Sequence, residues 1–348
     1  MFGSTYKNKR VLVTGDTGFK GSWLCEWLLM EGADVYGIAL PPDTKPSLYE
    51  QLELSSRIQH TDLDIRDKEL LAERILEIQP DFVFHLAAQP LVRRSYSEPV
   101  ETFHVNVMGT IHVMDALRCL STPCTAVMIT TDKCYENKEW LHGYREEDPM
   151  GGYDPYSASK GCAELAIASY RRSFFSSGNP VRIASARAGN VIGGGDWAED
   201  RIVPDMVRAL EAGKSIPVRN KTATRPWQHV LEPLSGYLLL ASKLASNTEL
   251  AGAYNFGPAL TSNRTVAELV VEGLNYWPGE WEDQSDPQAV HEAEKLNLAT
   301  DKAFHSLGWQ PKWNFKTTME KTISWYKNAN QNVAIRDLID ADLRAYMA

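Results

Sequence analysis

The sequence predicts an α/β fold in which helices cover both faces of a doubly wound, mostly parallel sheet. Short apolar runs alternate with longer helical patterns through the first half of the chain. The runs are nearly continuous in apolar character, which is typical of strands covered on both faces, and turn or helix signals flank each one. A chain of 348 residues is long enough for one large domain or two modest ones.

The expected elements follow in chain order. Arg10–Thr14 reads RVLVT and predicts the first strand, and a helical pattern follows it. After Arg187 the segments become rich in glycine, tryptophan and proline, which predicts a smaller C-terminal, substrate-facing lobe. Further strands are expected at 33–40, shortly before residue 64, at 81–86, at 125–131 and at 181–186, and helices at 19–31 and at 230–243, the last of them returning to the first lobe.

Charge and cysteine content exclude several classes of function. The net charge is -9 and the acidic residues are scattered, so the chain lacks the basic surface that sequence-independent nucleic-acid binding needs. Five cysteines without a C-x-x-C pair predict neither a metal site nor a disulfide framework, but the reduced thiols of a cytoplasmic protein. No apolar run approaches the roughly 18 residues of a membrane span, so neither a membrane anchor nor a signal peptide is expected.

A glycine-rich turn follows the first predicted strand. In VTGDTGFKGSWL, Gly15 ends the strand, Gly18 lies in the turn and Gly21 lies in the first turn of the predicted helix. Glycine permits a tight turn and close backbone approach, and a helix N-terminus offers free N–H groups to a pyrophosphate. We therefore predict a dinucleotide-binding loop, the alternative being an ordinary turn between a strand and a helix.

The rest of a dinucleotide site is less complete. Asp64 and Ile65 could flank an adenine, with the carboxylate accepting from its amino group, or Asp64 could cap the helix that follows. An acid for the ribose hydroxyls is usual at the end of the second strand. Here that strand ends in Ala-Leu-Pro-Pro at 39–42, and Asp43 is either a substitute or a turn residue.

Tyr156 and Lys160 lie one helical turn apart, so both side chains share a helix face. A nearby ammonium and an oxidised nicotinamide would favour the phenolate and let the tyrosine accept a hydroxyl proton. Such a pair is common by chance. The catalytic interpretation is supported by a polar run, Thr-Thr-Asp-Lys at 130–133, at the carboxyl end of an apolar strand. Open α/β sheets bind their ligands at that end of their strands.

Together these motifs resemble the extended short-chain dehydrogenases that act on nucleotide sugars, and the resemblance covers nearly the whole chain. TGDTGFKG is similar to the glycine motif of that family, HLAAQ to its fourth-strand motif, FHVNVMGT to the segment of its structural asparagine and YSASK to its catalytic pair. The resemblance implies a Rossmann-like sheet with NAD as cofactor. The residues that it places around NAD are Gly15, Thr17, Gly18, Phe19, Lys20, Gly21, Asp64, Ile65, Leu86, Ala87, Ala88, Asn106, Thr130, Tyr156 and Lys160.

Within this family a Thr-Asp-acid triplet marks the 4,6-dehydratases, and small residues mark the 4-epimerases. Here the triplet is Thr131-Asp132-Lys133, and its lysine resembles the CDP-glucose branch, as do RAGNVIGGGDW and TRPWQHV. CDP-D-glucose is therefore the substrate that the resemblance implies. The alternatives are a dehydratase for dTDP- or GDP-sugars, an epimerase or reductase of the same fold, and a catalytically silent scaffold that binds a dinucleotide.

The resemblance also implies catalytic roles. Tyr156 would take the proton of the sugar 4-hydroxyl while Thr131 holds that oxygen. Lys133 would then remove the C5 proton while a protonated Asp132 donates to the departing 6-hydroxyl. A lysine base must be neutral, and burial together with the charges of Lys160 and the oxidised nicotinamide would lower its pKa from about 10.4. Alternatively, Lys133 stays charged and orients Asp132 or the sugar.

The resemblance divides the chain into an NAD-binding domain, 1–186 with 226–258 returning to it, and a nucleotide-sugar-binding domain, 187–225 with 259–348. In the second domain Asn190, Arg201, Arg219 and Arg225 are candidates for the diphosphate, or else solvated surface residues. Gln89 is expected by the sugar, or else as an amide that caps its loop.

Three further residues are expected to be structural, namely His85, His229 and the packed thiol of Cys134. The resemblance also implies a homodimer or homotetramer that pairs helices within 98–117 and 156–175. Near-helical spacing of Val100, Phe103, Val107 and Ile111 is consistent with that.

Overall fold

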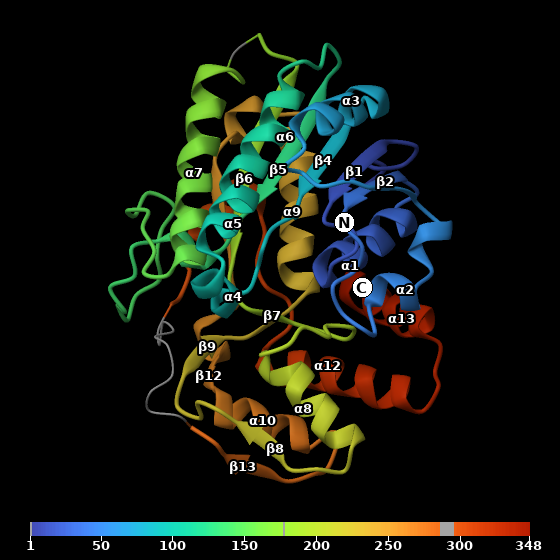
Figure 1. The fold of residues 1–348 in the computed structure, drawn as a ribbon, viewed down its shortest axis with the longest axis vertical. Helices are drawn as coiled ribbons and strands as arrows, with labels where there is room; N and C mark the ends of the chain where they lie inside the picture. Colours follow the sequence, from blue (N-terminus) through green and yellow to red (C-terminus); the bar gives the residue numbers. More distant parts are fainter. Residues whose placement is uncertain (1, 177, 286–295) are drawn as a thin grey trace.

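The computed structural model describes residues 2–176, 178–285 and 296–348. Its centre is a parallel sheet of seven strands in the order β11-β6-β5-β4-β1-β2-β3 (Figure 1). The sheet order reverses beside β1, as in doubly wound folds, so the predicted fold class is confirmed. The strands are β1 Arg10–Thr14, β2 Asp34–Ala39, β3 Gln59–Asp62, β4 Phe82–His85, β5 Cys124–Ile129, β6 Val181–Ala188 and β11 Ala253–Phe256.

Helices cover both faces of this sheet. Along β1, Val11 and Val13 pack into one core with α1 (Phe19–Met30) and α9 (Leu231–Leu244), whereas Leu12 packs into the other. This alternation explains why the strands are apolar at nearly every position. The second face carries α3 (Lys68–Ile78), α6 (Thr110–Leu117) and α7 (Pro155–Ser173).

The predicted elements are confirmed, with small differences at their ends. The first strand is as expected, and the helices at 19–31 and 230–243 are observed as α1 and α9. The strand predicted at 125–131 ends at Ile129, because Thr131 leaves the sheet to cap a 3₁₀ turn at Asp132–Cys134. Sequence analysis missed β11, which has four residues and includes the polar Asn255.

A smaller group of elements lies below the carboxyl edge of the sheet in Figure 1. Three pairs of short strands and three helices build it. The pairs are β7 (Val191–Ile192) with β10 (Gln228–His229), β8 (Ile216–Val218) with β13 (Trp281–Asp283) and β9 (Thr224–Pro226) with β12 (Asn263–Thr265), and the helices are α8 (Ile202–Glu211), α10 (Val266–Leu274) and α12 (Phe315–Asn330).

The chain crosses between the two groups several times. It returns to the sheet through α9 and β11, leaves again, and ends in α13 (Ile335–Met347) beside α1, where the Trp27 and Tyr346 rings are 5.8 Å apart. The short helices are α2 Leu48–Gln51, α4 Val92–Ser97, α5 Pro99–Phe103 and α11 Asp301–Leu307. Within the described ranges, no helix is long and apolar enough to cross a membrane.

Candidate active site

The triplet Thr131-Asp132-Lys133 lies just beyond the carboxyl end of β5. Thr131 caps the 3₁₀ turn, where its hydroxyl accepts from the Lys133 backbone N–H at 3.4 Å and donates to Asp132 Oδ1 at 2.9 Å. The Asp132 side chain is buried, and Lys133 is half-buried. The turn therefore places a hydroxyl, a carboxyl and a lysine amino group on consecutive residues at the ligand-binding edge of the sheet.

The helix α7 presents the Tyr156 and Lys160 side chains to the same edge. Asp154 fixes the start of this helix by accepting from the Ser157 backbone N–H at 2.9 Å, and Pro155 occupies its first position. Tyr156 and Lys160 are both buried, and the Thr131 side chain is close enough to the Tyr156 hydroxyl to lower its pKa. The structure thus brings together the catalytic residues predicted from the strand end and from the helix.

Burial opposes the charged forms of both α7 residues. It raises the pKa of Tyr156 to about 12, against the lowering effects of the Thr131 hydrogen bond and the Arg201 guanidinium. It also lowers the pKa of Lys160 to about 8, with the Lys20 ammonium acting in the same direction. Sequence analysis assigned the cation beside the phenol to Lys160, whereas the structure adds Arg201 to that role.

Asp132 is held in a setting that favours its neutral form. Burial raises the pKa of its carboxyl, although the charges of Lys133 and Arg225 lower it in part. A neutral carboxyl can donate a proton, so this environment fits the acid role predicted for Asp132. Gly189 leaves the space that the carboxyl occupies, because a Cβ there would lie 2.7 Å from Oδ2.

The glycine-rich loop fits a dinucleotide. Gly15 has a φ of +76°, and a Cβ on it would lie 2.7 Å from the Ala87 backbone nitrogen. A Cβ on Gly21 would lie 2.0 Å from the Gly15 carbonyl oxygen, so the loop and α1 pack at backbone distance. Gly18 is the N-cap of α1 and has no side chain to cap it. The first-turn N–H groups of α1 are thus available to a pyrophosphate.

Lys20 stands between this loop and the catalytic groups. Burial and the charge of Arg201 lower the pKa of its ammonium to about 8, and Asp132 opposes them. The lysine also acts on Lys160. Sequence analysis placed Lys20 only at the cofactor, whereas the structure connects it electrostatically with the residues of the chemical step.

The adenosine end of the loop contains a pair that sequence analysis missed. Asp16 is buried, and its Oδ2 lies 2.7 Å from His60 Nδ1 across the strand β2. Gly37 of β2 allows this, since a Cβ there would lie 2.2 Å from Asp16 Oδ2. His60 Nε2 lies 3.1 Å from Asp62, and β2 ends at Ala39 with Leu40, not an acid, after it. The sequence signal that could have predicted this pair is an acidic residue in the glycine-rich loop together with a histidine in the third strand.

Asp64 does not cap the following helix, so that alternative is wrong. Asp67 is the N-cap of α3, whereas Asp64 accepts hydrogen bonds from Arg66 and is thereby kept charged, with its pKa lowered. Ile65 is buried against Gly109. Asp43 is exposed, and its charge acts on Arg201. Contacts of Asp64 and Ile65 with an adenine stay predictions.

Asn106 and Gln89 form one buried network behind the loop at 86–91. Asn106 Oδ1 accepts from the Gln89 backbone N–H at 2.8 Å, and its Nδ2 donates to the Gln89 carbonyl oxygen and to Ser159 Oγ. The Gln89 amide accepts from the Leu91 N–H at 2.6 Å and donates to Thr102 Oγ1 at 2.9 Å. The loop-capping alternative for Gln89 is therefore observed, and a sugar contact stays a prediction.

The predicted diphosphate residues fall into two groups. Arg201 and Arg225 act on Tyr156 and Asp132, although Arg201 also pairs with Asp196 at 2.9 Å. Arg219 forms ion pairs with Asp200 and Asp205, and Asn190 is half-buried between β6 and β7. The structure thus connects two of the four residues with the catalytic groups.

His85, His229 and Cys134 have the structural roles that the sequence predicted. The two ring nitrogens of His85 contact Thr14 and Thr110 hydroxyls at 2.7 and 3.1 Å. Burial lowers the pKa of both histidines to about 3, so both are neutral. His229 packs against aromatic rings, and Cys134 is fully buried.

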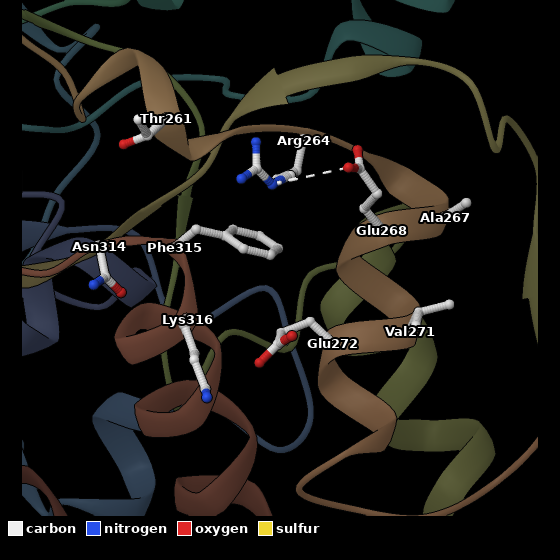
Figure 2. A pocket seen from close by; sticks show the side chains of 9 residues that line it. All are labelled: Thr261, Arg264, Ala267, Glu268, Val271, Glu272, Asn314, Phe315 and Lys316. Atoms are coloured by element: carbon white, nitrogen blue, oxygen red, sulfur yellow. Dashed lines mark ion pairs between the residues drawn. The ribbon is translucent and has the colours of Figure 1, made fainter.

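A separate hollow lies on the smaller lobe, between α10 and α12 (Figure 2). Arg264 and Glu268 form an ion pair at its rim, and the Phe315 ring lies beneath Arg264. None of its nine lining residues is a predicted site residue. The candidate site is therefore the sheet edge, not this hollow.

Comparisons with known proteins agree on the family. Residues 12–322 match the family model described as GDP-mannose 4,6 dehydratase. The chain is 47% identical over 331 residues to the CDP-glucose 4,6-dehydratase of Salmonella typhimurium, covering 92% of this chain and 91% of that protein. It is 25% identical to the dTDP-glucose 4,6-dehydratase of Haemophilus influenzae, covering 91% of this chain and 97% of that one.

Solved structures share the fold. The dTDP-glucose 4,6-dehydratase of Streptomyces venezuelae, solved with NAD bound, superposes with a TM-score of 0.79 at 24% identity and covers 92% of this chain and 98% of its own. The UDP-glucose 4-epimerase of Thermotoga maritima gives a TM-score of 0.79 at 20% identity, covering 92% of this chain and 99% of its own. With its family-model match extending from β1 to α12, this chain belongs to the GDP-mannose 4,6 dehydratase family.

Proposed function

We propose that this chain converts CDP-D-glucose to CDP-4-dehydro-6-deoxy-D-glucose and water. The observation that carries the proposal is the placement of Asp132 beside Lys133 on the turn that Thr131 caps, with the Thr131 side chain acting on the buried Tyr156. This combination supplies a proton acceptor for an oxidation and an acid with a candidate base for an elimination. The 47% identity to a CDP-glucose 4,6-dehydratase supports the nucleotide and the sugar.

NAD is the cofactor of the proposed reaction, and when bound it takes a hydride from C4 of the sugar and later returns it to C6. The backbone N–H groups at the start of α1 would hold its pyrophosphate. Thr17, Phe19, Lys20 and the loop at 86–88 would line the same site. Thr130 and Asn106 would support it from the sheet edge and from the network around Gln89.

The first step needs a proton acceptor at the sugar 4-hydroxyl. Tyr156 takes that proton. The charge of Arg201 offsets part of the effect of burial on its pKa, and Lys160 together with an oxidised nicotinamide would favour the phenolate further. Thr131 positions the same oxygen. The ketone that results at C4 makes the C5 hydrogen acidic.

The second step is an elimination across C5 and C6. Lys133 takes the C5 proton, and Asp132 gives a proton to the departing 6-hydroxyl, which leaves as water. Lys133 then returns a proton to C5 as the hydride adds to C6. One proton passing from Tyr156 to Asp132 restores the starting state. In the alternative, Lys133 stays charged and Asp132 serves as both base and acid.

The smaller lobe is proposed to bind the nucleotide. Arg201 and Arg225 would contact the diphosphate, since they approach the catalytic residues from that lobe, and Arg219, Asn190 and Gln89 would complete the site. This gives an NAD-binding domain of 1–186 with 226–258 and a nucleotide-sugar domain of 187–225 with 259–348. The packing of α9 and the pairing of β11 with β6 support that division.

We propose a cytoplasmic homodimer that pairs α5 to α7, with a homotetramer as the alternative. Val100 is 81% exposed and Leu165 is 60% exposed, and Phe103 of α5 and Phe174, directly after α7, are also exposed. Large exposed apolar groups on neighbouring helices are typical of subunit contacts. A monomer by light scattering at micromolar concentration would contradict the proposal.

One assay tests the reaction against its alternatives. The protein is incubated with CDP-glucose, and the alkali-induced absorbance of a 4-keto sugar is measured. We expect that absorbance to develop with time. An epimerase would give only an isomer, and a silent scaffold would give no product.

A further inference from the structure

A buried ion pair lies behind the catalytic residues and takes no part in the proposed chemistry. Glu164 and Arg187 are 3% and 4% exposed, and Arg187 NH2 lies 2.8 Å from Glu164 Oε2. Burial raises the pKa of Glu164, but the charge of Arg187 and several hydrogen bonds outweigh it and keep the carboxylate ionised. Burying two charges is costly, so such a pair is weak support for stability and calls for another role.

Glu164 contacts the residue that precedes the catalytic triplet. Its Oε1 accepts a hydrogen bond from the Thr130 hydroxyl, and its Oε2 accepts from Ser185 at 2.9 Å. Glu164 lies one helical turn after Lys160, as Lys160 lies one turn after Tyr156. The carboxylate therefore joins the helix of the first catalytic step to the end of β5.

Arg187 contacts the residue that follows the 3₁₀ turn. Its NH1 donates to the Tyr135 hydroxyl at 2.7 Å and to the Glu146 carbonyl oxygen at 2.9 Å. The Tyr135 hydroxyl in turn donates to Asn255 Oδ1 of β11 at 2.7 Å. Tyr135 is fully buried, so these bonds are shielded from water.

We infer that the Glu164–Arg187 pair is a positioning device that holds both ends of the Thr131–Cys134 segment against α7. Thr130 is anchored through Glu164 and Tyr135 through Arg187. The distance between the elimination groups, Asp132 and Lys133, and the oxidation groups on α7 is fixed by this pair. The kinetic part of this inference rests on the proposed dehydratase function.

Two consequences separate positioning from a purely structural role. Loss of these contacts lets Asp132 and Lys133 move away from their positions relative to α7. This slows the elimination more than the oxidation, because the two residues act only after the sugar is oxidised. Lys160 also faces the Lys20 ammonium, which lowers its pKa, and the Glu164 carboxylate and the Cys134 side chain, which raise it. If Lys160 works as an ammonium, loss of the Glu164 charge lowers the pKa at which it deprotonates. The alkaline decline of activity then moves to lower pH.

The test uses two variants with matched controls. Tyr135→Phe removes the hydroxyl through which Arg187 holds Tyr135. Glu164→Gln removes the carboxylate charge and weakens the hydrogen bond from Thr130. Tyr346→Phe and Glu232→Gln alter a separate buried contact, a tyrosine–carboxylate hydrogen bond of 2.6 Å between α13 and α9, away from the triplet. Each variant is mixed with CDP-glucose while the reduced-nicotinamide absorbance and product formation are followed, and backbone hydrogen exchange is measured at 131–135.

For Tyr135→Phe we expect product formation to fall by roughly 10-fold to 100-fold, as for a reacting group misplaced by about 1 Å. Reduced nicotinamide should accumulate, and the affinity for CDP-glucose should not change. Glu164→Gln should show the same effects, and in addition its alkaline decline of activity should move to lower pH. Hydrogen exchange at 131–135 should rise in both variants and in neither control.

Unchanged exchange at 131–135 in Tyr135→Phe would overturn the inference, as would equal slowing of both chemical steps. Tyr135→Phe decides the matter if Glu164→Gln does not fold, since it removes only one hydroxyl. Absence of turnover by the wild-type protein would refute the proposed function instead. The exchange measurement would still decide whether the pair holds the segment.

Discussion

Gly189 lies so close to Asp132 that a methyl group on its Cα would stand 2.7 Å from the carboxyl oxygen Oδ2. The backbone of β6 and the acid beyond β5 therefore fit together only without a side chain at 189. Gly189→Ala should displace Asp132 and slow the elimination by roughly 10-fold to 100-fold. Oxidation of the sugar should persist, so single-turnover absorbance would show reduced nicotinamide accumulating. Gly252→Ala is the control, because the atom nearest to its methyl is the end of the flexible Lys302 side chain, Nζ at 3.4 Å. Equal rates in the two variants would contradict the prediction.

Tyr156→Phe removes the proposed proton acceptor but keeps the ring. We expect the first oxidation to slow by roughly 100-fold to 10,000-fold, because the variant lacks the phenol hydroxyl that accepts the 4-hydroxyl proton in the proposed reaction. Binding of CDP-glucose should stay nearly intact, since the phenol adds little affinity before the reaction. Calorimetric binding and stopped-flow absorbance measure the two effects separately. Weaker binding with unchanged turnover would refute the assigned role.

Lys133→Met tests the base of the elimination. The variant should still oxidise the sugar, so reduced nicotinamide should accumulate when CDP-glucose is added. It should not exchange the C5 hydrogen with solvent deuterium, which mass spectrometry of the sugar detects. Normal incorporation of deuterium at C5 would leave Asp132 as both base and acid.

Catalytic efficiency should favour CDP-glucose over dTDP-glucose and UDP-glucose. We expect a preference of about tenfold or more, which corresponds to about 1.4 kcal/mol in the transition state. The reason is the similarity of the second-lobe motifs to the CDP branch. Steady-state kcat/KM values for the three nucleotides measure the preference. Equal values would remove the substrate assignment and leave the reaction class in place.

The Asp16–His60 pair predicts how stability depends on pH. Its hydrogen bond to Asp16 raises the pKa of His60, so the charged histidine stabilises the folded state. This contribution is complete below the ordinary histidine pKa of about 6.5 and is lost as pH rises through the higher folded value. Urea unfolding across this range should show a decline in the wild type that His60→Gln lacks. The same decline in the variant would assign it to other groups.

Sequence analysis predicted the elements that a local pattern defines. The apolar strands and the glycine loop could be found because each is continuous in sequence, and the Tyr156–Lys160 spacing follows from helix geometry. It missed β11, whose four residues form a strand only because β6 offers a free edge.

The site residues that were missed depend on contacts between distant segments. Asp16 reaches His60 only because Gly37 lies between them, and no local pattern encodes that passage. The charge of Arg201 beside Tyr156 likewise results from how the smaller lobe packs below the sheet. Such relationships need the tertiary structure.

Arg201 and Arg225 belong to segments of the smaller lobe, whereas the groups on which they act, Tyr156 and Asp132, stand at the edge of the sheet. A rotation that withdrew the arginines would raise the proton affinity of both acids, and closure would lower it. The proton affinities of Tyr156 and Asp132 therefore depend on how closely the smaller lobe packs against the sheet edge. Contacts between a bound diphosphate and these arginines would therefore be coupled to the acidity of the phenol that must ionise.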